Sequence, residues 1–263
     1  MKWMDVNGVS LRYELSNANA DKQTVVLIHE LGGSLDSWDE TLAHFQHDFR
    51  TLRYDQRGFG HSEKVSGTLA LGDMVADIAA LLDALAIKSP VYVVASALGA
   101  GIAAAFAARH PARVARLVIQ SLVTRSNPAT REHMEKRAAE VERTGMRAQA
   151  QASLERSYPE VLRGNKERFE TYRARWIAND PQSFAAINRM LLEMNVDVEL
   201  GKITAPTLSI GCKHDVMRTP PMVQEITKLI PDVRYVEAES GHFMHAQTPE
   251  LFAQMVLPFL LGK

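Results

Sequence analysis

Short, wholly apolar runs alternate with longer helical stripes over most of the chain. The runs at 25–28 and 91–94 carry no charge, which is typical of parallel strands buried on both faces. Between them, residues 73–85 place apolar side chains at 74, 75, 78, 81, 82 and 85, a spacing that predicts an amphipathic helix. Strands that alternate with helices predict a parallel sheet covered by helices, so the fold class is α/β.

The remaining segments extend this pattern from end to end. Asn7-Gly8 between two alternating segments, 2–5 and 9–14, predicts a β-hairpin. The other core elements that the pattern predicts are strands at 49–54, 116–122, 206–210 and 233–236, and helices at 98–109, 221–230 and 249–261.

The pattern changes between residues 125 and 201, where long stretches of Glu, Arg, Ala and Met replace the apolar runs. We expect this segment to be a helical cap, inserted into a core formed by residues 1–124 and 202–263. It follows a strand of the sheet, so it should lie over the carboxyl ends of the strands, where open α/β sheets bind their ligands.

Composition and charge narrow the class of protein. The chain has 263 residues, of which 46% are hydrophobic and 23% charged, as in ordinary globular proteins. A net charge of −1 argues against nucleic acid or an anionic membrane as the main partner. We find no signal segment and no apolar stretch long enough to span a membrane, so we expect a cytoplasmic protein. The single cysteine, Cys212, excludes an intramolecular disulfide and is expected to be a small buried hydrophobe.

Residues 91–101 combine a strand, a very tight turn and an alanine-rich helix. Such a turn presents a nucleophile at its middle residue, between two small residues that fit the sharp bend. The small residues here are Ala95 and Gly99, which makes Ala97 the middle residue. Ser96 lies one position too early, because its flanking residues would then be Val94 and Leu98. The site is therefore predicted to have no attacking atom at its nucleophile position.

Two further turns follow strands at the same edge of the predicted sheet. Asp215 comes after the strand at 206–210, and His242 comes after the strand at 233–236. A histidine in such a loop can act as general base and general acid, while a carboxylate orients its ring. Position 97, the acid and the histidine follow one another in the chain order of α/β-hydrolase triads.

Backbone N–H groups complete the predicted site. The Leu98 N–H lies at a helix N-terminus, where the helix dipole favours an anion. A second N–H should come from the loop after the strand at 25–28, and Leu31 is the expected donor because Gly32 and Gly33 let that loop approach a substrate. Together they predict an oxyanion hole.

The motifs together resemble those of the α/β-hydrolases over nearly the whole chain. They are His29-x-x-Gly32 with Trp38 downstream, Asp55-x-Arg57-Gly58-x-Gly60-x-Ser62, Ala95-x-Ala97-x-Gly99, Gly211-x-x-x-Asp215 and Gly241-His242-Phe243-x-His245-x-x-x-Pro249-Glu250. The resemblance implies a mostly parallel eight-stranded sheet with helices on both faces and a helical cap. Within the family, the chain looks most similar to 3-oxoadipate enol-lactonases and related ring-cleavage-pathway hydrolases.

That resemblance implies hydrolysis of a small carboxylic ester, enol-lactone or amide, or cleavage of a C–C bond, by a Ser-His-Asp mechanism. Two positions depart from the family pattern. Glu30 stands where many relatives have glycine; its side chain could face solvent, which we favour, or place a charge near the substrate. Ala97 stands where the family has serine.

Three interpretations of Ala97 are open at this point. In the first, which we favour, the alanine is an engineered replacement that inactivates a serine hydrolase. In the second, the alanine is natural, and His242 with the oxyanion hole performs decarboxylation, lyase or cofactor-free oxygenase chemistry. In the third, the chain binds a ligand without catalysis, although the retained acid and histidine argue against that.

The expected partner is a small molecule, most simply a carboxylic acid derivative. Four residues are candidates for binding it: Trp38, Arg125, Trp176 and His245. Arginine has the planar fork that matches a carboxylate, and tryptophan supplies an apolar wall. No spacing of histidine and cysteine predicts a metal site, and no glycine-rich motif after a strand predicts a nucleotide, so we expect neither a metal nor another cofactor.

Overall fold

Eight strands form one sheet in the computed structural model, which describes residues 2–16, 21–65 and 67–263. The strands are β1 (Lys2–Val6), β2 (Val9–Leu15), β3 (Thr24–Ile28), β4 (Arg50–Tyr54), β5 (Val91–Ser96), β6 (Val114–Gln120), β7 (Thr207–Cys212) and β8 (Val233–Ala238). Their order across the sheet is β1-β2-β4-β3-β5-β6-β7-β8. β1–β2 and β2–β4 pair antiparallel and the other neighbours pair parallel, which confirms the predicted sheet.

The predicted hairpin at the N-terminus is also confirmed. β1 and β2 pair from Val6–Val9 outward, and Asn7 and Gly8 form the turn with φ of 48° and 72°. Positive φ at both central residues is what a two-residue turn between twisted strands requires.

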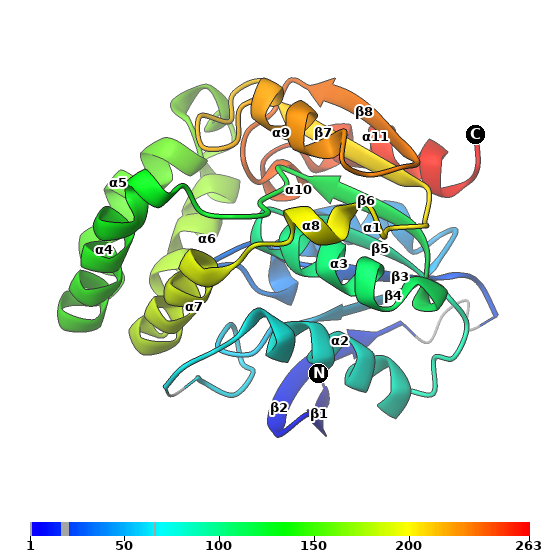
Figure 1. The fold of residues 1–263 in the computed structure, drawn as a ribbon. Coiled ribbons are helices and arrows are strands. Elements are labelled where there is room, and N and C mark those ends of the chain that lie inside the picture. Colours follow the sequence, from blue (N-terminus) through cyan, green and yellow to red (C-terminus); the bar gives the residue numbers. More distant parts are fainter. Residues whose placement is uncertain (1, 17–20, 66) are drawn as a thin grey trace.

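Helices cover both faces of the sheet (Figure 1). The larger core lies under α2 (Leu71–Ala84), α3 (Leu98–Arg109), α8 (Asp197–Leu200) and α9 (Pro220–Thr227). A second core lies on the opposite face, under α1 (Asp39–Phe45) and α11 (Pro249–Leu260). Between the cores, β3 is buried at every residue, which explains why its sequence is a continuous apolar run without alternating polar residues. The short α10 (Met244–Gln247) follows the loop after β8.

The long segment between β6 and β7 forms four further helices. They are α4 (Arg131–Thr144), α5 (Arg147–Ser157), α6 (Lys166–Ile177) and α7 (Pro181–Glu193). In Figure 1 they form a separate group, in green to yellow-green, beyond the arrowheads of the parallel strands. Helical structure was predicted throughout this segment. The charged stretch at 131–157 divides at Gly145, whose φ of 80° ends α4.

Several boundaries differ from those predicted from the sequence. β5 continues two residues beyond 94, to Ser96, because its last residues still pair with β6. α1 was not predicted, since its seven residues are too few to show a clear helical period. Cys212 is fully buried, and burial raises the pKa of its thiol to about 12, so the prediction of an inert apolar residue is confirmed.

Candidate active site

Ala97 occupies the sharp turn between β5 and α3. Its backbone has φ 50° and ψ −112°, a conformation that residues with a Cβ rarely adopt. Three backbone hydrogen bonds anchor the turn: Ala97 N–H donates to the Gln120 carbonyl at 2.9 Å, and the Ala97 carbonyl accepts the N–H groups of Ala100 at 3.1 Å and Gly101 at 3.3 Å. The strained residue is therefore position 97, as the spacing of the small residues predicted.

Gly99 shows why the turn needs small neighbours. A Cβ at this position would lie 2.6 Å from the His29 carbonyl oxygen and 2.7 Å from that of Ile28, closer than van der Waals contact allows. The first turn of α3 therefore packs directly on the end of β3. Ser96, by contrast, is an ordinary buried strand residue whose hydroxyl donates to Gln120 Oε1 at 2.5 Å, so it cannot serve as an exposed nucleophile.

Asp215 and His242 form a buried pair. The Nδ1 atom of His242 donates to Asp215 Oδ2 at 2.7 Å. Asp215 Oδ1 also accepts the N–H groups of Met217 and Arg218, both at 2.9 Å. Burial on its own would raise the pKa of Asp215, but the charge of His242 and these hydrogen bonds lower it, so the acid stays ionised. The Nε2 atom of His242 has no partner among the described residues and is available for proton transfer.

A chain of hydrogen bonds that was not predicted from the sequence holds the carboxylate of this pair in place. The Ser121 hydroxyl donates to Asp215 Oδ2 at 2.7 Å, and Gln120 Nε2 donates to the Ser121 hydroxyl. Gln120 also accepts the hydroxyl of Ser96, and its Nε2 lies 3.5 Å from the Gly241 carbonyl. Because the Gln120 carbonyl receives the Ala97 N–H, one residue connects the strained turn with the loop that carries His242.

The loop after β3, which we call the β3 loop (Glu30–Gly33), is held in a tight turn. Gly33 N–H and His29 Nδ1–H both donate to the Glu30 carbonyl, at 3.1 and 2.8 Å. His29 Nε2 accepts the Gln56 N–H at 3.0 Å, and burial lowers the pKa of His29, so its ring is neutral. Neither the Leu31 N–H nor the Leu98 N–H has a partner among the described residues. Both are free to donate to a ligand.

Glu30 is fully buried, so the expectation that it faces solvent was wrong. Its carboxylate accepts His245 Nε2–H at 3.0 Å and the Ser37 hydroxyl at 3.0 Å. Burial would raise the pKa of Glu30, but the charge and hydrogen bond of His245, with a smaller contribution from His29, lower it to about 2. Glu30 therefore carries a buried negative charge beside the β3 loop.

The four candidate binding residues lie in different environments. Trp176 is 3% exposed and packs on the β3 loop, in the same core cluster as Ala97. His245 is fully buried and bonded to Glu30, and Trp38 stacks on it with ring centroids 4.1 Å apart. Trp38 belongs to the core on the opposite face of the sheet. Arg125 is exposed and forms an ion pair with Asp197 at 3.1 Å. Of these four residues, Trp176 and His245 therefore contact the β3 loop.

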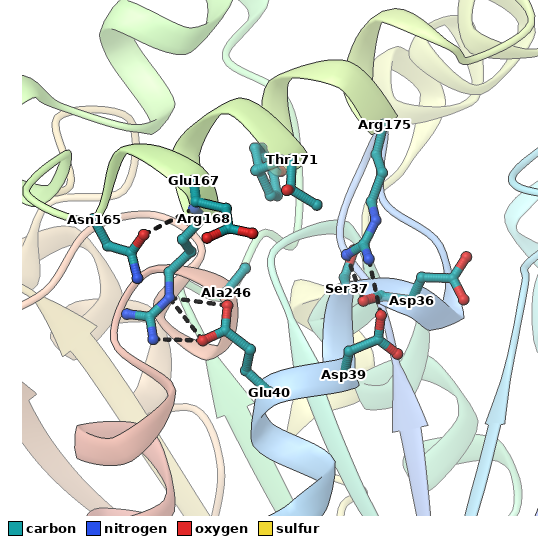
Figure 2. A pocket seen from close by; sticks show the side chains of 11 residues that line it. Asp36, Ser37, Asp39, Glu40, Asn165, Glu167, Arg168, Thr171, Arg175 and Ala246 are labelled. Atoms are coloured by element: carbon teal, nitrogen blue, oxygen red, sulfur yellow. Dashed lines mark hydrogen bonds and ion pairs between the residues drawn. The ribbon is translucent and has the colours of Figure 1, made fainter.

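A cavity of about 330 Å³ lies between α6 and the start of α1 (Figure 2). Two arginines of α6 cross it to reach carboxylates of the core. Arg168 Nε donates to Glu40 at 2.9 Å, and Arg175 donates to Asp39 at 2.8 Å and to the Asp36 carbonyl at 2.6 Å. These guanidinium groups fasten the cap to the core and are not free to bind a substrate carboxylate.

A model of the alpha/beta hydrolase fold family matches residues 23–249. The chain belongs to the α/β-hydrolase family. Among curated relatives, the protein named "Putative carbamate hydrolase RutD" from Caulobacter sp. (strain K31) is 30% identical, over 93% of this chain and 92% of the relative. The RutD protein of Pantoea ananatis is also 30% identical, over 94% of this chain and 91% of the relative.

Solved structures of α/β-hydrolases superpose closely. The enol-lactonase of Burkholderia xenovorans LB400 matches with a TM-score of 0.92 and 27% identity, over 99% of this chain and 100% of that one. A thermophilic esterase from Thermogutta terrifontis matches with a TM-score of 0.93 at 22% identity, which shows a shared fold. The predicted family, the hydrolase class and the likeness to an enol-lactonase are thereby confirmed.

Two further findings concern metal binding and membrane-spanning helices. Among residues 2–16, 21–65 and 67–263, no cluster of His, Cys, Asp and Glu side chains is suited to hold a metal ion. The same part of the chain contains no helix with the length and hydropathy needed to cross a bilayer.

Proposed function

We propose that this site hydrolyses a small ester, enol-lactone, amide or carbamate through a serine nucleophile at position 97, and that Ala97 stands in place of that serine as an engineered replacement would. The observation that carries the proposal is the strained turn itself. An alanine at φ 50° and ψ −112° costs about 1–3 kcal/mol, which glycine would largely relieve. Backbone strain of this kind is concentrated at functional sites, which supports a role in the chemistry for the side chain at this turn.

The groups that a serine would need follow parallel strands at the same edge of the sheet as this position. His242, oriented by Asp215, would take the hydroxyl proton through its unbound Nε2. The Leu31 and Leu98 N–H groups would bind the oxyanion of the tetrahedral intermediate. His242 would then return the proton to the leaving group, and water would release the acyl group from position 97.

The likeness to relatives supports the class of bond. The RutD proteins are named as carbamate hydrolases, and the Burkholderia protein is an enol-lactonase. Both names describe attack on a carbonyl carbon bearing an oxygen or nitrogen leaving group. We therefore propose a small carbonyl compound as the substrate, bound beside Ala97 and the Leu31 N–H with Trp176 as an apolar wall, in a protein that works in the cytoplasm.

The test is to assay Ala97→Ser against small aryl esters, enol-lactones and carbamates. Hydrolysis that appears only in this variant, with a burst of the first product, supports the proposal. Ala97→Gly is the matched control, because it relieves the strain without supplying a hydroxyl. Turnover by the unsubstituted chain that Ala97→Ser does not improve would overturn the proposal in favour of a nucleophile-free reaction. The absence of turnover in every variant, with ligand binding retained, would favour a binding protein.

A further inference from the structure

One face of cap helix α6 lies on the β3 loop. Tyr172, Trp176 and Asn179 are spaced four and three residues apart, so they project from the same side of the helix and the turn that ends it. Tyr172 contacts Phe243, and Trp176 and Asn179 both contact Gly32. This face connects the cap with the loop that carries the Leu31 N–H.

Asn179 makes the direct polar connection. Its Nδ2 donates to the Gly32 carbonyl at 2.7 Å, and the same group lies 3.0 Å from the Trp176 carbonyl and 3.2 Å from the Arg175 carbonyl. The last carbonyls of a helix have no partner within the helix. One amide group therefore satisfies the end of α6 and holds the β3 loop at the same time.

Trp176 and Tyr172 shape the surroundings of that hydrogen bond. Gly32 has φ 81°, and a Cβ there would lie 2.8 Å from the indole ring of Trp176, so the ring packs against the loop backbone. Tyr172 stacks on Phe243, next to His242, with ring centroids 5.4 Å apart. Burial and the nearby charge of Glu30 raise the pKa of Tyr172, which keeps its phenol neutral. The face thus contacts both the β3 loop and the loop of the histidine.

The core holds the other side of the same turn. Gly33 N–H and His29 Nδ1–H fix the Glu30 carbonyl. In a trans peptide the N–H points opposite to the C=O, so fixing the Glu30 carbonyl directs the Leu31 N–H away from His29. Two residues further along the loop is the Gly32 carbonyl. Within the described part of the chain, only the cap holds it. The core therefore holds the peptide that carries the Leu31 N–H, and the cap holds the same tight turn two peptides later.

We propose that Asn179 is a positioning residue for the oxyanion hole: by binding the Gly32 carbonyl from the end of α6, it sets the direction of the Leu31 N–H when the cap is docked. This inference rests on the proposed function, because it takes Leu31 as an oxyanion donor. The inference adds that a residue of the cap positions an oxyanion hole whose two N–H donors belong to the core.

The experiment compares Ala97→Ser with the double variant Ala97→Ser/Asn179→Asp, which replaces the donor amide by an isosteric carboxylate. Removing an oxyanion-hole donor costs about 10²–10³ in kcat, and a misdirected donor should cost about tenfold. We expect kcat for a small aryl ester to fall about tenfold while KM changes less than about twofold, because the loop acts on the transition state.

Asn165→Asp is the matched control. Asn165 begins the same helix, its Oδ1 accepts the Arg168 N–H at 3.0 Å, and aspartate caps a helix equally well. This control should leave both constants unchanged. If Asn179→Asp does not fold, Asn179→Ala removes the donor without adding a charge. A double variant whose kcat stays within about twofold of Ala97→Ser, or whose KM alone rises, overturns the inference.

A second measurement separates this inference from the proposed function. If Ala97→Ser hydrolyses no substrate, the proposed function fails, and the amide NMR resonances of Leu31 and Gly33 decide the inference in the unsubstituted chain. Asn179→Asp should shift both resonances and Asn165→Asp should shift neither. Resonances that do not respond to Asn179→Asp would show that the cap does not orient this loop.

Discussion

Two histidines three residues apart, His242 and His245, each bind a carboxylate, and the protein places the two pairs in different surroundings. His242 binds Asp215 through Nδ1, which leaves Nε2 without a partner. His245, three residues later, binds Glu30 through Nε2, while its Nδ1 is buried with no partner among the described residues. The chemical groups are the same, but only the first pair presents a nitrogen that can exchange a proton.

The difference comes from the neighbours of each ring. His242 stands beside Phe243 at the edge of the site, with its acid held by backbone N–H groups and Ser121. The ring of His245 is stacked on Trp38 and fully buried. A carboxylate beside an imidazole is thus insufficient to identify a catalytic pair. The free nitrogen and its access to the reacting position decide the role.

The largest expected effect is a loss of activity on substitution of His242, which distinguishes it from His245. In the Ala97→Ser background, His242→Gln should lower kcat about 10²–10⁴-fold, because the general base is lost. Its melting temperature should fall less than in Glu30→Gln, because Asp215 keeps hydrogen bonds from two backbone N–H groups and the Ser121 hydroxyl. Steady-state kinetics and thermal unfolding check both parts. A His242→Gln variant that retains more than a tenth of the activity would show that the two pairs do not differ in this way.

The second effect concerns stability. Glu30→Gln should lower the free energy of unfolding by about 3 kcal/mol, because removing one partner of a buried ion pair leaves the other uncompensated. Glu40→Gln is the matched control: Glu40 is half exposed in its ion pair with Arg168 and should contribute less than about 1 kcal/mol. Urea unfolding measures both. Equal losses in the two variants would contradict a structural role for the Glu30–His245 pair.

The third effect is the pH dependence of that stability. The pKa of Glu30 is lowered to about 2 in the folded protein, from about 4.5 when unfolded. The stabilisation is therefore complete above about pH 4.5 and is lost as the pH falls towards 2. The difference in unfolding free energy between the unsubstituted chain and Glu30→Gln should shrink over this range. A difference that is constant between pH 5 and 3 would show that Glu30 is not ionised in the folded protein.

The smallest effect tests the support of Asp215. Ser121→Ala removes one of the hydrogen bonds to the carboxylate, a contribution of about 1 kcal/mol, so kcat in the Ala97→Ser background should fall about fivefold. Ser126→Ala is a control, because that hydroxyl bonds to the Leu192 carbonyl. Unchanged kinetics in Ser121→Ala would show that the backbone donors suffice to hold the acid.

The sequence predicted those features that depend on local chain geometry. Apolar runs predicted the buried strands, and Asn7-Gly8 predicted the hairpin. The spacing of Ala95 and Gly99 located the strained turn at Ala97 rather than Ser96, because only a small residue fits where α3 meets β3. The order of position 97, Asp215 and His242 predicted a dyad that the structure shows bonded at 2.7 Å.

Features that depend on distant contacts were not predicted. Nothing near Glu30 in the sequence shows that its partner is His245, 215 residues away. The same holds for the bond from Asn179 to Gly32, which spans 147 residues. Gln120 ends β6 and Ser121 directly follows it, so a search for polar residues at every strand end would have found them.

The buried thiol of Cys212 has a practical consequence for spectroscopy. With a pKa near 12 and no exposure, it should not react with maleimides at neutral pH. A cysteine introduced at an exposed position of the cap would then be the sole labelling site of the native protein, and a second on the core would complete a pair for spin-label or fluorescence distance measurements. The distance distribution between them would report how often the cap leaves the sheet.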